Sequence, residues 1–165
     1  MIPASGRKIA NPSGMNLKNA SLRQLLLLIV FIGVVGLEVE LALLRHADSF
    51  TQFIPHIALL IGLLSTVLVY LRPRPGTLKA FQLVMVMFLI VGALGVVLHL
   101  KGNIEFATER DPSLSGMKLI WKVLRGATPA LAPGALAQLG LLGLLYTYRH
   151  PALPGANDNQ PENSR

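Results

Sequence analysis

Residues 22–44 read LRQLLLLIVFIGVVGLEVELALL, an apolar run that is interrupted near its C-terminal end by Glu38 and Glu40. At about 1.5 Å of rise per helical residue, such a run can cross a hydrocarbon core of about 30 Å. Three runs of similar character follow at residues 53–71, 78–100 and 130–148. The pattern predicts an all-α membrane protein in which four helices form a transmembrane bundle over residues 21–148.

The composition agrees with this class of protein. Of the 165 residues, 52% are hydrophobic and 14% are charged, whereas a soluble domain carries about 25% charged residues. The net charge is +7, but the lysines and arginines are spread over segments next to the expected spans, where such residues set orientation and meet anionic headgroups. We therefore expect a lipid bilayer, and no nucleic acid, as the partner of these basic residues.

The distribution of basic residues predicts the orientation of the chain. More lysines and arginines lie in residues 1–23, in the loop at 72–79 and after residue 148 than in the other two loops. By the positive-inside rule, both termini are then cytoplasmic. We expect residues 1–20 to be a flexible cytoplasmic leader and residues 149–165 a disordered cytoplasmic tail. The short polar loops favour a multi-pass protein of the bacterial inner membrane.

The third loop predicts a further, amphipathic helix over residues 112–125. Asp111 can cap its start, Pro112 fits the first helical position and Gly126 fits just past its end. One face is apolar and another is basic, the residues being Leu114, Met117, Trp121 and Leu124 on the first and Lys118, Lys122 and Arg125 on the second. We expect this helix to lie in the outer interface with Trp121 at headgroup depth, or to cap the bundle as a lid.

Ionisable residues within the spans are candidates for a functional site, because they are costly in a bilayer. Glu38, Glu40, His56 and His99 all fall toward the outer ends of their spans. Two histidines at similar depth on neighbouring helices can ligate a b-type haem, and with Glu38 or Glu40 they can hold zinc, copper or iron. The alternative is a set of structural polar contacts, such as an ion pair between Glu38 and Arg45. The sequence leaves open whether these side chains converge.

Small residues in the spans predict close contacts between helices. Gln138 is the polar residue nearest the middle of the fourth span, and we expect it to form a hydrogen bond across such a contact. The glycines expected at helix contacts are Gly33, Gly36, Gly92, Gly95, Gly140 and Gly143.

Three functions remain open on these observations. The first is a non-enzymatic accessory or assembly subunit, acting through its glycine-lined helix faces on a membrane-protein partner or on further copies of itself. The second is a redox protein that binds haem or a transition metal through the outer histidines and glutamates. The third is a carrier for a small solute or for protons.

Overall fold

The computed structural model describes residues 21–44, 50–126, 131 and 133–154. The expected leader at 1–20 and the last part of the expected tail, 155–165, lie outside these ranges. In the described residues the chain forms helices and no strand, which confirms the all-α class. The helices are α1 (Leu22–Leu43), α2 (Phe50–Leu71), α3 (Pro75–Arg110), α4 (Gly116–Leu124) and α5 (Gly134–Thr147).

Three of these helices are long and apolar enough to cross a membrane, namely α1, α2 and α3. α1 begins at a capping box, in which the Ser21 hydroxyl oxygen accepts from the N–H of Gln24 and the Gln24 side chain accepts from the N–H of Ser21. α2 and α3 are separated by a turn at residues 72–74, and Pro75 opens α3, where its missing N–H leaves no hydrogen bond unmade. The two helices therefore run antiparallel and in contact.

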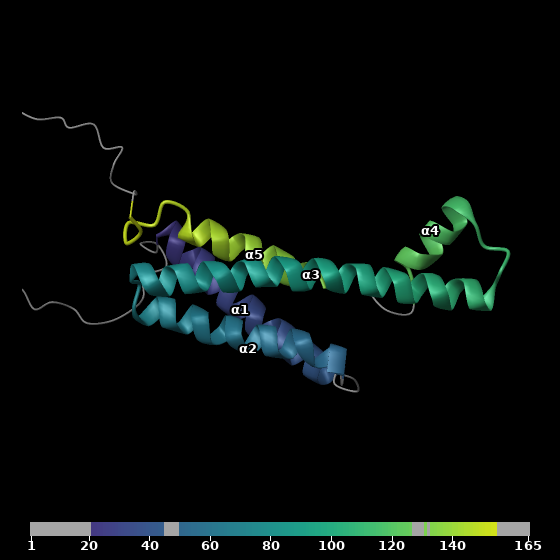
Figure 1. Cartoon of the computed structure of the whole chain (residues 1–165), viewed down its shortest axis with the longest axis horizontal. Coiled ribbons are helices and arrows are strands. Elements are labelled where there is room, and N and C mark those ends of the chain that lie inside the picture. The colour runs from purple at the N-terminus through teal and green to yellow at the C-terminus, as the bar shows by residue number, and fades with distance from the viewer. Residues whose placement is uncertain (1–20, 45–49, 127–130, 132, 155–165) are drawn as a thin grey trace, which may run out of the picture.

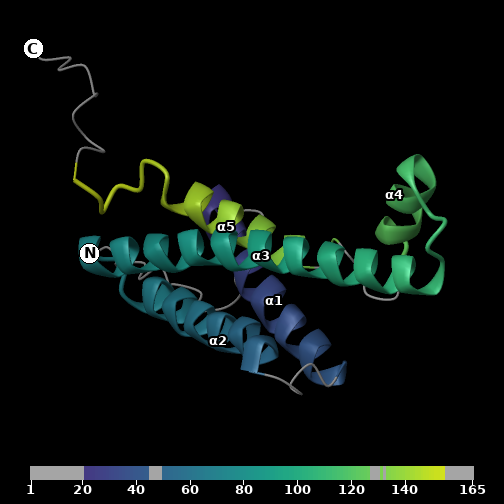
Figure 2. The ribbon, with the colours of Figure 1, turned by 45° about the vertical axis from the view of Figure 1, so that its right-hand side comes forward.

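α1, α2, α3 and α5 pack in a closed ring, in which α1 contacts α2 and α5, and α3 contacts the same two helices from the opposite side. Figures 1 and 2 show the start of α1, the α2–α3 turn and the end of α5 at one end of this assembly. Apolar side chains from all four helices fill its centre, including Val30, Val34, Leu59, Phe81, Met85, Phe88 and Leu139.

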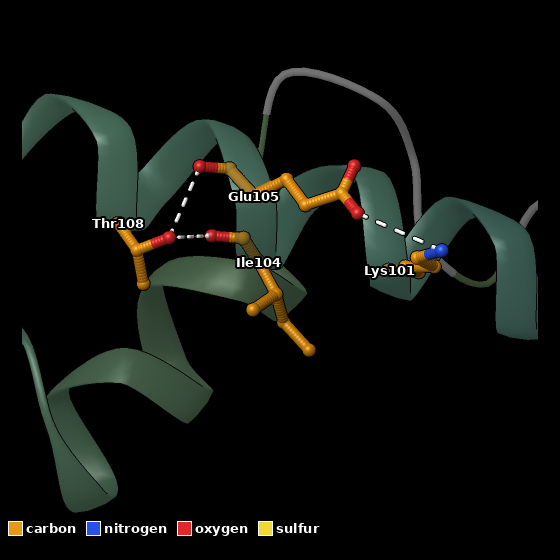
Figure 3. Close-up of polar contacts among 4 residues, drawn as sticks. All are labelled: Lys101, Ile104, Glu105 and Thr108. Carbon is orange, nitrogen blue, oxygen red and sulfur yellow. Dashed lines mark hydrogen bonds and ion pairs between the residues drawn. The ribbon is translucent and has the colours of Figure 1, made fainter.

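α3 differs from the expected span at 78–100, because it continues to Arg110 and has 36 residues. At about 1.5 Å per residue it is roughly 54 Å long, and it runs on beyond the ends of α1 and α2 (Figure 1). Its polar end holds its own local contacts (Figure 3): Lys101 and Glu105 form an i,i+4 ion pair of 3.7 Å, and the Thr108 hydroxyl donates to the carbonyl of Ile104. The helix stops only where Pro112 disfavours helical geometry at Asp111.

The amphipathic helix expected at 112–125 is shorter than predicted, since α4 begins at Gly116. Asp111 does not cap it. Its carboxylate instead accepts from the N–H of Ser113 at 3.0 Å and from the hydroxyl of Ser113 at 2.6 Å, which forms a turn after α3. These two bonds hold the pKa of Asp111 below its usual value. Gly116 has a φ of +55°, a backbone conformation that glycine adopts without strain.

The fourth expected span is also shorter in the structure. α5 has 14 residues, about 21 Å, whereas residues 127–130 and 132 lie outside the described ranges. α5 begins after Pro133 and ends before Arg149, which has a φ of +47°. Residues 149–154, expected to belong to a disordered tail, instead form turns, and Ala152 and Leu153 pack against the core.

Candidate functional site

Two of the predicted polar residues meet between α1 and α2. The imidazole Nδ1 of His56 lies 2.9 Å from the carboxylate Oε1 of Glu38. Glu38 is five residues before the end of α1 and His56 is six residues after the start of α2, so each lies roughly 8 Å inside its helix end. The antiparallel arrangement of the two helices places them at the same level. The expected pair of Glu38 with Arg45 lies outside the described residues.

The surroundings of this pair are aliphatic. A groove of about 300 Å³ runs beside it, lined by Val34, Val35, Val39, Ile57, Leu59, Leu60 and Leu63 as well as the pair. The side chains of His56 and Glu38 are 17% and 44% exposed, respectively. The second carboxylate oxygen of Glu38 is buried without a hydrogen-bond partner. In the part of the chain that the structure describes, the Glu38 carboxylate has the His56 ring as its hydrogen-bond partner, and loss of that contact would be costly for a partly buried carboxylate.

The other two residues of the predicted cluster lie elsewhere. Glu40 is exposed on another side of α1, since residues two apart in a helix point about 200° away from each other. His99 is half-buried on α3. Counted from the α2–α3 turn, His56 is 15 residues along α2 and His99 is 24 residues along α3, which puts His99 roughly 13 Å farther along the bundle. By this count the two histidines lie at different levels along the bundle.

This arrangement limits the metal chemistry predicted from the sequence. Within the described ranges, no three histidine, aspartate or glutamate side chains gather closely enough to hold a metal ion together. Zinc sites usually take three or four protein ligands, and Glu38 and His56 supply two. The difference in depth likewise separates His56 from His99 as a pair of ligands for one haem. What the Glu38–His56 pair can do by itself is share or pass a proton between a carboxylate and an imidazole.

Most of the predicted packing glycines face other helices of the same chain. A Cβ atom on Gly92 would lie 2.7 Å from the backbone nitrogen of Ala137, and one on Gly140 would lie 2.6 Å from the carbonyl oxygen of Met85. The same is true of three more, since Gly33 faces Leu139, Gly95 faces Pro133 and Gly143 faces Met85 and Phe81. These glycines bring α5 close to α1 and α3, and their surfaces are used inside the chain.

Two residues of that predicted group point outward instead. Gly36 faces open space, with no atom within 4 Å of a Cβ placed there. Gln138 is exposed on α5 and so does not lie in a contact between helices of this chain, because its neighbours Leu139 and Gly140 occupy the buried side.

Gly36 belongs to an exposed strip of α1 that we call the α1 outer face, formed by Ile32, Gly36 and Glu40. These residues are four apart and lie on one side of the helix, and all three are exposed. The Glu40 side chain makes no ion pair or hydrogen bond with any residue that the structure describes. A carboxylate next to a glycine therefore stands on the outside of the assembly.

A further polar site, at the opposite end of the assembly, was not predicted. The Arg23 guanidinium donates to the backbone carbonyls of Tyr146, Tyr148 and Arg149, each at 2.9 Å, and so caps the C-terminal end of α5. His150 is buried beside it, with its ring 5.4 Å from that of Tyr146. Burial lowers the pKa of His150, and the nearby Arg23 charge lowers it further. Arg23 and its acceptors are more than 120 residues apart, so no local pattern signals this contact.

The residues predicted for the interface are all on the exposed surface of α4, which packs against the far end of α3. There the Asn103 side chain donates to the carbonyl of Val123 at 3.0 Å. Trp121 is 61% exposed, and the Arg125 guanidinium lies 5.6 Å from the centre of its ring. Lys118 and Lys122 are exposed as well.

No protein-family model matches the chain, and neither a curated protein nor a solved structure shows significant similarity to it.

Proposed function

We propose that the chain is a multi-pass protein of the bacterial cytoplasmic membrane, in which α1, α2, α3 and α5 form a four-helix transmembrane bundle. The support is the apolar length of α1, α2 and α3 and the closed ring that α5 completes. Figure 1 shows the start of α1, the α2–α3 turn with the start of α3, and the end of α5 at the same end of this assembly. These segments carry the basic residues Arg23, Arg72, Arg74, Lys79 and Arg149. We assign that end, with both termini, to the cytoplasmic side. We assign α4 to the opposite, outer surface of the same membrane.

Within this placement, we propose that the protein is a non-enzymatic accessory or assembly subunit that binds another membrane protein. The observation that carries this proposal is the α1 outer face. An ionisable residue on the lipid side of a span is costly, and such residues normally face a protein interior or a partner. Gly36, one turn before Glu40, gives a second helix room to approach closely. A helix with a hydrogen-bond donor opposite Glu40 would satisfy the carboxylate.

The other predicted glycine surfaces do not serve this role, because α5 covers them. The α1 outer face is therefore the surface to which we assign partner binding. The Glu38–His56 pair favours a second candidate, a proton-linked or metal-binding function. We place it second because the pair offers two donors, whereas a metal site or a haem needs further ligands at the same level.

The test is photo-crosslinking in native membranes. A photoreactive amino acid replaces Ile32 on the α1 outer face, and a matched variant carries it at Leu64 on α2; the two positions are 60% and 62% exposed. We expect a discrete protein adduct from position 32 and lipid adducts from position 64. The mass of the adduct separates a second copy of this chain from a different protein. Glu40→Gln should lower the yield at position 32.

Lipid adducts alone from both positions, with the protein present and folded, would contradict the proposed subunit role. Equal protein adducts from both positions would show that the contact is not specific to the α1 outer face, with the same consequence.

A further inference from the structure

We propose that α4 is a recognition element for anionic phospholipid headgroups, which anchors the far end of α3 to the outer leaflet. The proposal rests on the membrane placement given above and adds the chemical identity of what α4 binds. It concerns the arm, which we define as residues 101–126, comprising the end of α3, the turn after it and α4.

α4 has three distinct faces, set by the helical repeat of about 100° per residue. The face turned to α3 carries Leu119, Val123 and Gly126, of which Val123 is buried. The other two faces are exposed, with each set of residues at helical spacing. The apolar one carries Met117, Ile120, Trp121 and Leu124, and the basic one carries Lys118, Lys122 and Arg125.

No other part of the chain covers the apolar face in the described residues, although it holds the largest side chains of α4. Both views show α4 inclined to α3 and lying outside the ring of the other helices (Figures 1 and 2). A helix that is strongly amphipathic, basic on one side and Trp-bearing on the other, is the type that lies in a membrane interface. In the proposed arrangement α3 spans the membrane and α4 lies along its surface, and the inclination between the two helices is compatible with this.

The depth of α4 also fits. The hydrocarbon span of α3 ends near Lys101, where the sequence becomes polar. α4 contacts α3 through the hydrogen bond of Asn103 with Val123, and Asn103 is roughly 3 Å beyond that point. The headgroup layer of a leaflet is about 5–8 Å thick. Trp121 and Leu124, near the Asn103 end of α4, therefore lie at headgroup level, the depth that tryptophan prefers.

The charge of the arm selects the kind of lipid. Three cations project from α4 with no acidic residue between Gly116 and Gly126. The end of α3 and the turn after it carry three acidic residues: Glu105 pairs with Lys101, Glu109 is exposed, and Asp111, which accepts from Ser113, also interacts with the charge of Lys122. The arm is still net positive, because its five lysines and arginines exceed these three acids. A surface of this charge attracts phosphate groups with a net negative charge, and each cation near an anionic membrane strengthens binding about fivefold. We therefore infer phosphatidylglycerol-like headgroups rather than zwitterionic ones.

Trp121 is the single tryptophan of the chain and reports directly on α4. The full-length protein is placed in nanodiscs of phosphatidylcholine alone or of phosphatidylcholine with phosphatidylglycerol, each containing lipids brominated near the headgroup end of the acyl chain. We expect the bromines to quench Trp121 in both membranes, and more strongly with phosphatidylglycerol. The excess should disappear in high salt, which screens exposed charges.

Two matched triple variants identify the charges responsible. Replacing Lys118, Lys122 and Arg125 by glutamine should abolish the excess quenching with phosphatidylglycerol. Replacing Arg72, Arg74 and Lys79 by glutamine removes three exposed cations at the other end of α3 and should leave the excess unchanged.

The outcomes distinguish two claims: that α4 lies at the membrane surface, and that it recognises anionic lipid. Equal quenching in the two membranes, unaffected by the α4 variant, would overturn anionic recognition and leave the surface position of α4 standing. A water-exposed, unquenched Trp121 in both membranes would overturn the surface position too and indicate a soluble partner for the apolar face. Neither result depends on the α1 outer face, which the crosslinking experiment tests separately.

Discussion

A methyl group added at Gly92 tests the contact on which the packing of α5 depends. In Gly92→Ala the new Cβ would lie 2.7 Å from the backbone nitrogen of Ala137 and 2.9 Å from the carbonyl oxygen of Pro133. Backbone atoms cannot rotate away as a side chain can, so α5 must move outward from α3. That movement also loosens the contact of Gly140 with the backbone of Met85.

The expected loss of stability follows from two opposing terms. Overpacking a filled interior costs about 1–3 kcal/mol, and a backbone clash belongs at the upper end of that range. Alanine is the better helix former and returns about 1 kcal/mol. We expect Gly92→Ala to lower the free energy of unfolding by about 2 kcal/mol, or roughly 30-fold in the equilibrium constant.

The control is the same substitution at Gly36, where nothing lies within 4 Å of the added atom. Unfolding is followed in mixed micelles of a mild detergent and increasing dodecyl sulfate, with helix content and Trp121 fluorescence as readouts. Gly36→Ala should be neutral or slightly stabilising. If Gly92→Ala proves as stable as the unaltered protein, or if both variants lose the same amount, the close approach of α3 and α5 is not what holds α5 in place.

Two further predictions concern the polar sites. A double-mutant cycle with Glu38→Leu and His56→Leu should give a coupling energy of about 0.5–3 kcal/mol, because each single change removes the contact between the two side chains; additive losses of unfolding free energy would argue against a direct pair. The second prediction follows from the lowered pKa of His150. The opened form takes up a proton more readily than the folded form below about pH 6.5, so residues 149–154 should become more accessible to protease as the pH falls through that value. The dependence should flatten in His150→Gln, and a pH-independent digestion rate in the unaltered protein would contradict it.

The apolar runs predicted the helices, because a segment apolar enough to lie in lipid must satisfy its backbone hydrogen bonds internally, as a helix does. They predicted the ends less well. Hydropathy falls at Lys101, and a span was therefore expected to end there, although nothing in the segment from Lys101 to Arg110 breaks a helix. The real stop signal is Pro112, which acts on Asp111 through steric exclusion. A drop in hydropathy marks where a helix becomes polar, and it does not mark where the helix ends.

Reading position from the polar ends of the apolar runs also affected the predicted site. His56 and His99 were placed at one level because each lay near the polar end of its run. Their true levels depend on the distance of each from the α2–α3 turn, and that distance is longer for His99. Glu38 and His56 meet because each lies a similar distance from the other connection, between α1 and α2. The contact of Arg23 with the end of α5 was beyond prediction, since its acceptors are backbone carbonyls that carry no sequence signal.

α3 connects the two surfaces for which we propose partners. It packs against α5 through Gly92 and Gly95 in the bundle, and it holds α4 through Asn103 roughly 12 Å farther along. No proline or break interrupts the helix between these points. The two ends of this segment therefore move together as one rigid body. If α4 binds the outer leaflet, the tilt of α3 in the membrane is set from its far end. α2 and α5 pack against α3, and α1 packs against both of them, so the α1 outer face would then be held in a defined orientation toward a partner. The two proposals would then be linked: anchoring of the arm to lipid would orient the α1 outer face for the proposed contact with another protein.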